Sequence, residues 1–371
     1  MDLGGAAQAA ERVGVCLSGQ MQEIRFFSSW GSLLSANLSL VLSRSGWRRR
    51  IMEILVGKNR TFRWETIWVR RRLRKLISEF RPAVILVNNL DRGPGWGPQL
   101  LESCVRAAPT LWLLHDMFSL GAGSHYFRPE AMPSAAGSFW KTPRLEQAIR
   151  KGRLVAVAPS RWLADLASQS AWSGGRVEHI PNPLPISRDL PAPSTSTPRG
   201  FCLITSDFYD SRKMPLGSQR FLQAVVAAGH EVHLAGRSRP NIEGASWHGF
   251  IGKEGELATF FRQVNLNLHL SILDNLPNTL AEASIFGVPS LIRDRVGGSL
   301  ELTPEEFRSW AVFPENGSEA IEFVVRRIRE VVSRPEIGEL FRRHVQELLD
   351  PRKIAARYER LFTDLFRNGK V

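Results

Sequence analysis

The chain has 371 residues, 43% of them hydrophobic and 23% charged, and a formal net charge of +13. This composition excludes disordered and fibrous proteins, and the length exceeds what one hydrophobic core usually serves, so two domains are predicted. The cysteines Cys16, Cys104 and Cys202 have the spacing of neither a disulfide framework nor a metal site, which favours a reducing cytosol.

The first residues lack the layout of a signal peptide, and no apolar run approaches the ~20 residues needed to span a bilayer. We therefore expect a cytoplasmic protein that is soluble or peripheral at the inner face of the membrane.

The first distinctive segment is strongly basic. Between Arg44 and Lys75, twelve cations stand against two acids, with Trp47, Trp64 and Trp68 among them. Such an excess predicts an anionic partner, and the sequence carries no recognised nucleic-acid-binding module. The interleaved tryptophans favour an anionic membrane surface over a merely solvated helix face. The segment ends in an amphipathic helix pattern over residues 69–80.

Short apolar runs then alternate with helical patterns. Predicted strands, after one near Ile24–Phe27, are Ala83–Val87, Thr110–Leu114, Leu154–Ala158, Phe201–Thr205, Glu231–Ala235, Leu266–Leu270 and Val288–Ile292. Most are continuously apolar, as parallel strands covered on both faces are. The alternation predicts an α/β protein with doubly wound sheets.

A linker rich in proline and serine, Pro181–Gly200, separates two halves of the chain. We place the boundary near Leu190, which gives an N-terminal Rossmann-like domain over 1–190 and a C-terminal one over 191–350. Residues 351–371 form a helix that starts at Pro351 and is expected to pack back on the first domain. Two such domains are expected to face a cleft that holds the ligand.

The segment Leu268–Ile292 carries the strongest chemical signal. It predicts a strand, a polar loop and a helix for which Asn278 is the expected N-cap. A helix N-terminus favours a diphosphate, Glu282 one turn later suits the vicinal hydroxyls of a ribose, and Asp274 suits those of a second ring. A nucleotide-sugar presents all three groups, although spacing alone fits a capped helix with a surface glutamate equally well.

This segment, with its D-N-L-P-N-T-x-x-E-A-x-x-x-G-x-P pattern, resembles the signature of glycosyltransferase family 4, a retaining family with the two-domain GT-B fold. The resemblance implies that Asp274 contacts sugar hydroxyls, where many members have glutamate, and that Glu282 contacts the ribose. It also places a set of loop and helix-start residues at the sugar donor: Asn275, Leu276, Pro277, Asn278 and Thr279. Pro277 removes one N–H that other branches have.

Four further segments resemble the same family. VAVAPSRWLADLA and VEHIPNPLP match its strand–turn–helix and I-P-N segments. LLHDMFSLGAGSHYF matches its H-D-M-W segment and places His115 at the end of a buried strand as a catalytic residue together with Asp274. SDFYDSRKMP matches its phosphate loop, with Lys213 on the diphosphate and Arg212 as the alternative cation. Phe208 stands where the family often has an arginine, which puts a two-cation clamp in doubt.

The N-terminal MDLGGAAQAAERV resembles the family's first glycine-rich loop and helix, with Gly4 and Gly5 at the sugar donor. The buried strand that precedes this loop in the family does not precede it here. We therefore expect a gap in the first sheet beside the strand near Ile24–Phe27, and a functional protein that begins upstream.

Taken together, the resemblance implies a retaining glycosyltransferase. It would use a nucleotide-sugar and a lipid-linked or glycan acceptor in surface polysaccharide (lipopolysaccharide-type) biosynthesis. No Asp-x-Asp pair or His/Cys cluster in the sequence suggests a metal, whose role the helix dipole and Lys213 can fill, and no cofactor is expected. Two alternatives remain open: a GT-B nucleotide-sugar 2-epimerase, and a non-catalytic scaffold.

Overall fold

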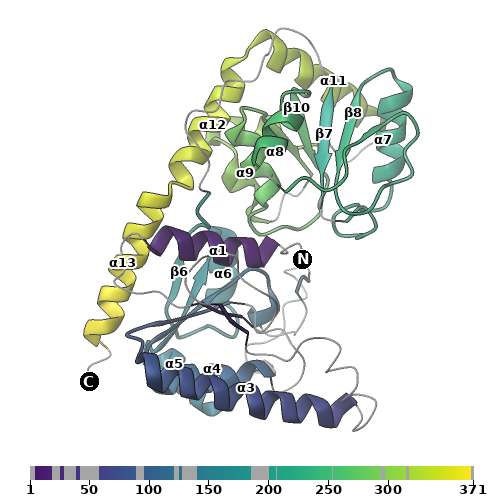
Figure 1. Ribbon diagram of the computed structural model, residues 1–371. Helices are drawn as coiled ribbons and strands as arrows, with labels where there is room; N and C mark the ends of the chain where they lie inside the picture. The colour runs from purple at the N-terminus through teal and green to yellow at the C-terminus, as the bar shows by residue number, and fades with distance from the viewer. Residues whose placement is uncertain are drawn as a thin grey trace. The chain divides into compact units, whose positions relative to one another are not determined.

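The computed structural model describes residues 5–18, 26–28, 39–41, 58–88, 96–120, 125–127, 140–184, 200–205, 207–252, 254–293, 297–314 and 317–368. The chain divides into two compact units, Met1–Pro183 with Pro351–Val371, and Leu184–Asp350. Each unit has its own parallel sheet (Figure 1). The boundary expected near Leu190 falls within residues 185–199, outside the described residues.

The main sheet of the first unit has four parallel strands in the order β3-β4-β5-β6. Their bounds are Ile85–Val87, Thr110–Leu113, Leu154–Ala158 and Val177–His179. The connecting helices are α4 (Trp96–Ala107), α5 (Pro143–Arg150) and α6 (Arg161–Ser168). Every residue of β4 and β5 is buried, as their continuously apolar sequences predict for strands covered on both faces.

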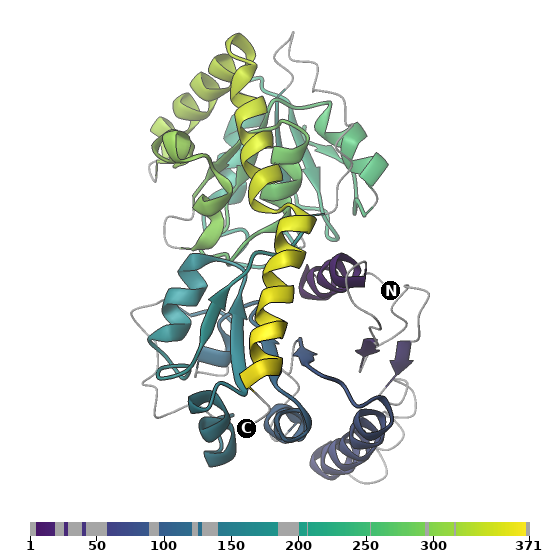
Figure 2. The same cartoon turned by 90° about the vertical axis from the view of Figure 1, so that its left-hand side faces the viewer.

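Helices α1 (Gly5–Ser18) and α13 (Pro351–Asn368) pack against each other in the first unit (Figure 2). Val13 and Tyr358, from the two helices, join a core cluster with Leu111 of β4 and Val155 of β5. The cluster explains why the last helix, which begins at Pro351 as predicted, returns to the first unit. The opposite face of β4 carries Trp112, which packs edge-on against two other buried tryptophans.

Helix α3, Lys58–Phe80, contains the described part of the basic segment and confirms the predicted amphipathic helix at 69–80. Its exposed cations within the described residues are Arg71, Arg72, Arg74 and Lys75. Residues 42–57, with Trp47, lie outside the described residues, as do the side chains of Trp64 and Trp68.

Strands β1 (Phe26–Ser28) and β2 (Ser39–Val41) form a separate parallel pair. The strand expected near Ile24–Phe27 is thus present, shifted toward its C-terminal end. Among the described strands, β3 is an edge of the four-stranded sheet and does not pair with β1. The strand inferred to be missing would precede Gly4 and Gly5, and residues 1–4 lie outside the described residues, so that expectation stays a prediction.

The second unit contains a five-stranded parallel sheet in the order β11-β10-β7-β8-β9. The strands span Phe201–Ile204 (β7), Val232–Ala235 (β8), Ser246–Trp247 (β9), Leu266–His269 (β10) and Ser290–Ile292 (β11). The helices include α7 (Ser218–Ala227), α8 (Glu254–Phe261), α9 (Asn278–Ile285), α11 (Gly317–Ser333) and α12 (Glu336–Leu348). Its shorter helical turns are η4 (Gly298–Leu302), η5 (Glu305–Phe307) and α10 (Arg308–Ala311), and the first unit contains the turn η1 (Phe118–Leu120).

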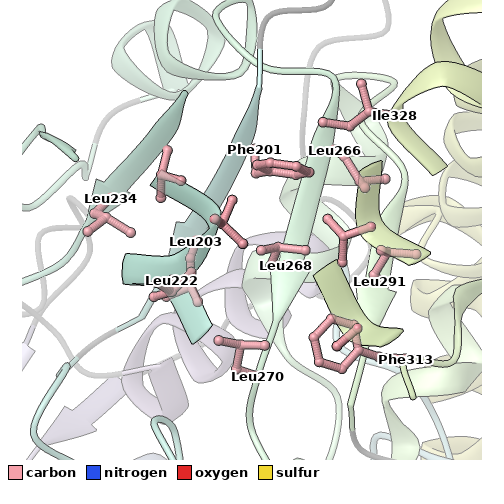
Figure 3. Packing of buried hydrophobic residues seen from close by; sticks show 14 of the residues in the cluster. Phe201, Leu203, Leu222, Leu234, Leu266, Leu268, Leu270, Leu291, Phe313 and Ile328 are labelled. Atoms are coloured by element: carbon pink, nitrogen blue, oxygen red, sulfur yellow. The ribbon is translucent and has the colours of Figure 1, made fainter. Parts of the chain in front are cut away.

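The core of this unit lies between its sheet and helices α7 and α11 (Figure 3). Phe201, Leu203, Leu266 and Leu268 project from the two central strands into one cluster. On the other side of the sheet, Cys202 packs with residues of α8 and α9. Helices on both faces confirm the predicted doubly wound α/β architecture.

All seven apolar runs predicted downstream of the basic segment are strands, with ends up to two residues from those expected. The strands that the sequence did not reveal are β2, β6 and β9. Residues of β6 and β9 are half-buried or exposed, and each of these strands lies at the edge of its sheet. A short edge strand lacks the continuous apolar run that marks a central one.

Candidate functional site

The strand order of the second unit defines where a ligand can bind. From β7 the chain proceeds outward through β8 to β9, then returns to place β10 on the other side of β7. The loops after β7 and β10 therefore leave the sheet at its topological switch point, where α/β sheets bind ligands beyond the carboxyl ends of their strands. These are the loops that carry Arg212 and Lys213, and Asp274.

The two loops meet in a compact charged cluster. Lys213 Nζ donates a hydrogen bond to Asp274 Oδ2, and Arg212 Nη1 lies 3.7 Å from the same oxygen. Arg212 Nη1 also donates to the carbonyl oxygen of Leu273 at 3.0 Å, and its own carbonyl accepts from the Ile272 N–H at 3.1 Å. The sequence predicted Arg212 only as the alternative to Lys213, but both cations lie at the same carboxylate oxygen of Asp274.

The Asp274 carboxylate is ionised although the residue is only 5% exposed. Burial alone raises the pKa of this carboxyl, but Lys213, His269 and Arg212 outweigh burial and hold the pKa below its usual range. The Asn275 N–H donates to Oδ1 at 3.1 Å, and the Gly298 N–H donates to the Asp274 carbonyl at 3.0 Å. Backbone N–H groups of the loop and of η4 thus hold Asp274 in place, with its carboxylate beside the two cations.

His269, the last residue of β10, completes the cluster, and sequence reasoning missed it. Its Nε2 atom lies 3.8 Å from Asp274 Oδ2, is buried, and makes no hydrogen bond. Burial lowers the pKa of His269 to about 4; Asp274 opposes this shift, and Lys213 and Arg212 add to it. The imidazole is therefore neutral at neutral pH. A histidine at the carboxyl end of a buried strand was the available signal.

Helix α9 begins directly after this loop, and the expected N-cap was wrong by one residue. Pro277 occupies the capping position, with φ −70° and ψ 122°, and Asn278 is the first helical residue. Proline takes this position readily because its φ is fixed near that value, and its missing N–H leaves Asn278 and Thr279 to supply the first backbone donors. Glu282 lies one turn later on the same side of the helix as Asn278.

Leu276, from the predicted donor set, and Phe208, which stands where the family often has an arginine, both pack against hydrophobic residues. Leu276 packs against a core cluster that includes Leu280 and Leu302. Phe208, where a second cation was in doubt, is 1% exposed and packs edge-on against Trp247 at 5.7 Å between ring centroids. Phe208 thus belongs to the core, and the second cation beside Asp274 comes from Arg212.

In the first unit, His115 follows β4 and bonds through Nε2 to Asn88 Oδ1 at 2.9 Å. Burial lowers the pKa of His115 to about 4 against the opposing effect of Asp116, so the ring is neutral at neutral pH. Asp116 bonds to His125 Nδ1 at 2.6 Å and accepts from the Phe118 N–H at 2.9 Å. The His125 ring stacks on Phe118 at 5.4 Å.

Gly5 is the first residue of α1, and Gly4 lies outside the described residues. Among the residues that the structure describes, no three His, Cys, Asp or Glu side chains gather where they could hold a metal ion. In the same part of the chain, no helix is both long and apolar enough to cross a membrane.

Comparison with solved structures defines the fold. Sucrose-phosphate synthase from Thermosynechococcus elongatus is similar with a TM-score of 0.68 and 16% identity, over 98% of this chain and 94% of that one. WaaG, a glycosyltransferase involved in lipopolysaccharide biosynthesis, is similar with a TM-score of 0.60 and 12% identity, over 98% and 97%. The chain has the GT-B fold.

HepE from Anabaena in complex with UDP-glucose shares this GT-B fold with a TM-score of 0.65 and 13% identity, over 98% of this chain and 97% of that one. No family model matches the sequence. No curated protein matches it either. At such identities the likeness establishes the fold, and the activity has to be argued from the site.

Proposed function

We propose that this GT-B protein is a glycosyltransferase that binds a nucleotide-sugar on its second unit and moves the sugar to a glycan acceptor. The observation that carries the proposal is the pair of cations, Arg212 and Lys213, beside the start of α9 at the topological switch point. Backbone N–H groups and cations together suit a diphosphate. HepE, of the same fold, binds UDP-glucose.

The chemistry follows from the charges. When the bond between the sugar and the diphosphate breaks, negative charge grows on the leaving phosphate. Lys213, Arg212 and the positive end of α9 stabilise that charge without a metal or cofactor. Asp274 then holds the sugar hydroxyls and Glu282 the ribose, as the resemblance to glycosyltransferase family 4 implies. The same resemblance supports retention of the anomeric configuration.

The first unit supplies the acceptor side of the proposal. His115 is neutral and tied to Asn88, so it acts as a hydrogen-bonding group toward a sugar and not as a strong acid. The Asp116–His125 pair offers a second polar group after the same strand. The acceptor that best fits the basic face of α3 is a lipid-linked glycan of surface polysaccharide synthesis, reached from the cytoplasmic side of an anionic membrane.

The proposal is tested by offering the purified protein UDP-, GDP- and dTDP-sugars. We expect the nucleotide-sugars of one base to raise the melting temperature of the protein. We also expect the protein to cleave that nucleotide-sugar slowly, releasing the nucleoside diphosphate, and to do so faster when an acceptor is present. Binding without any release points to a scaffold, and interconversion of the sugar at C2 points to an epimerase. Failure of every nucleotide-sugar to bind would refute the assignment.

Glu282 provides a residue-level check of the same site. Replacing Glu282 with alanine is expected to weaken nucleotide-sugar binding by about 1.5–3 kcal/mol, the usual contribution of hydrogen bonds to a charged group. Glu322→Ala, an exposed change on α11, is the matched control and should leave the affinity unchanged. An affinity of Glu282→Ala equal to wild type removes Glu282 from the site.

Membrane attachment is proposed for α3. Changing Arg71, Arg72, Arg74 and Lys75 together to glutamine should weaken binding to anionic vesicles, since each surface cation contributes about 1 kcal/mol there. The combined loss of about 4 kcal/mol is roughly a thousandfold in affinity. Co-sedimentation at low and high salt measures it.

The matched control removes four exposed cations from the second unit: Arg220, Arg329, Arg334 and Arg343. We expect the control to sediment with anionic vesicles as the wild type does. If both variants lose the same affinity for vesicles, the effect comes from net charge and not from α3. If wild-type binding does not change with salt, the attachment is not electrostatic.

A further inference from the structure

In the charged cluster of the second unit, the buried ring of His269 lies beside Asp274 without a hydrogen bond from its Nε2 atom. Lys213 bonds to Asp274 Oδ2, while His269 Nε2 lies 3.8 Å from the same oxygen without a hydrogen bond. Leaving a buried polar atom unsatisfied is unfavourable, because the atom has given up its hydrogen bonds to water. The position of this ring, 95% removed from solvent and beside a carboxylate, therefore calls for a functional reason.

His269 is neutral in the free protein because the cluster already holds two cations. Burial favours the neutral ring, and although Asp274 attracts a proton to it, Lys213 and Arg212 repel one. Within the described residues, these three are the charged groups that act on the ring, and they come from the loops after β7 and β10. The charge of His269 therefore depends on whether the two cations are engaged with Asp274 or with something else.

A diphosphate changes that balance. The side chains of Lys213 and Arg212 are 18% and 22% exposed and can turn toward a ligand, whereas that of Asp274 is 8% exposed and fixed by its loop. Charges this close together interact strongly even at the effective dielectric of a protein surface. A dianionic ligand that draws both cations away removes their repulsion on His269, while the negative charge of Asp274 stays close to the ring.

We propose that His269 is the reserve partner of Asp274, taking up a proton from solvent when a diphosphate ligand engages Lys213 and Arg212. His269 is then a positioning residue: its protonated ring keeps Asp274 ionised and fixed for the sugar. The inference rests on the proposed binding of a nucleotide-sugar at this site. It adds that such binding carries a proton into the protein.

The direction of the pH dependence follows from the linkage. A group whose pKa rises on binding takes up protons, so affinity increases as pH falls from the bound-state pKa toward the free-state value of about 4. Where uptake is complete, the affinity for the nucleotide-sugar changes by about tenfold per pH unit. Above the bound-state pKa the affinity no longer depends on His269.

The experiment is calorimetric titration of the full chain with whichever of UDP-glucose, GDP-mannose and dTDP-glucose binds. Their diphosphates are diesters, which do not titrate near neutral pH, so the ligand adds no protons of its own. Comparing PIPES with imidazole buffer, which differ in ionisation enthalpy and both buffer near neutral pH, gives the number of protons taken up from about pH 6 to pH 8. His269→Gln keeps a polar side chain but cannot titrate, and His230→Gln, in the turn after α7, is the control.

We expect proton uptake by the wild type and by His230→Gln, and none by His269→Gln. If the wild type binds with no proton exchange, this inference is overturned and the proposed function stays intact. If proton uptake persists in His269→Gln, the proton belongs to another group, and the inference is again overturned. If His269→Gln does not fold, the slope of wild-type affinity against pH decides: a flat profile overturns the inference. If none of the three ligands binds, the sugar-donor site itself fails, and this inference fails with it.

Discussion

Replacing Lys213 with methionine is expected to lower the rate of sugar transfer by about 10²–10³-fold, the usual effect of removing one preorganised group that stabilises a developing anion. Methionine retains most of the volume of the lysine stem but not its charge. Because the charge on the leaving diphosphate is largest in the transition state, the turnover rate should fall more than the affinity for the nucleotide-sugar. Steady-state kinetics of nucleotide release measures both.

Two control variants test whether the effect of Lys213→Met comes from the lost charge at this position. Lys213→Arg keeps the charge and should retain more activity than Lys213→Met, although the fork of arginine differs in shape from an ammonium group. Arg220→Met, an exposed change on α7, should behave as wild type. If Lys213→Met keeps the wild-type turnover rate, Lys213 does not contact the leaving group.

Replacing Asp274 with asparagine is expected to lower the free energy of unfolding by about 3 kcal/mol, the low end of the range for removing one member of a buried ion pair. The change leaves Lys213 and Arg212 without their buried counter-charge, but both side chains reach water, which limits the cost. Urea unfolding followed by fluorescence measures the loss. A saturating nucleotide-sugar should stabilise this variant more than the wild type, because it supplies the missing negative charge.

The matched control is Asp210→Asn in the loop after β7. Its carboxylate also lies near Arg212, at 3.5 Å, but its side chain is 36% exposed. Exposed pairs contribute about 0–1 kcal/mol, so the control should lose far less stability. Similar losses in the two variants would contradict the special position of Asp274.

The stabilisation of the fold by ionised Asp274 should also depend on pH. The pKa of Asp274 in the folded protein is below its usual range. A carboxyl with a depressed pKa stabilises the fold above its unfolded-state pKa of about 3.9 and loses that effect as pH falls through the folded-state value. The difference between wild type and Asp274→Asn in unfolding free energy should therefore be constant near neutral pH and shrink below about pH 4.

The sequence by itself determined the elements that depend on local pattern. Continuously apolar runs such as Leu154–Ala158 predicted the buried strands, Pro351 predicted the start of the last helix, and the segment around Asp274 predicted a strand, a loop and a helix. Each rests on signals within a few residues, because periodicity and the conformational limits of proline act over one or two turns of chain.

Only the tertiary structure decided which of these residues meet. The order β11-β10-β7-β8-β9 brings the loop of Lys213 to that of Asp274, and it also places His269 beside the same carboxylate. Strand order depends on pairing between segments that are far apart in the sequence, and no local pattern encodes such pairing. Lys213 and Asp274, which the strand order brings together, are 61 residues apart. For the same reason, only packing against Trp247 revealed that Phe208 belongs to the core.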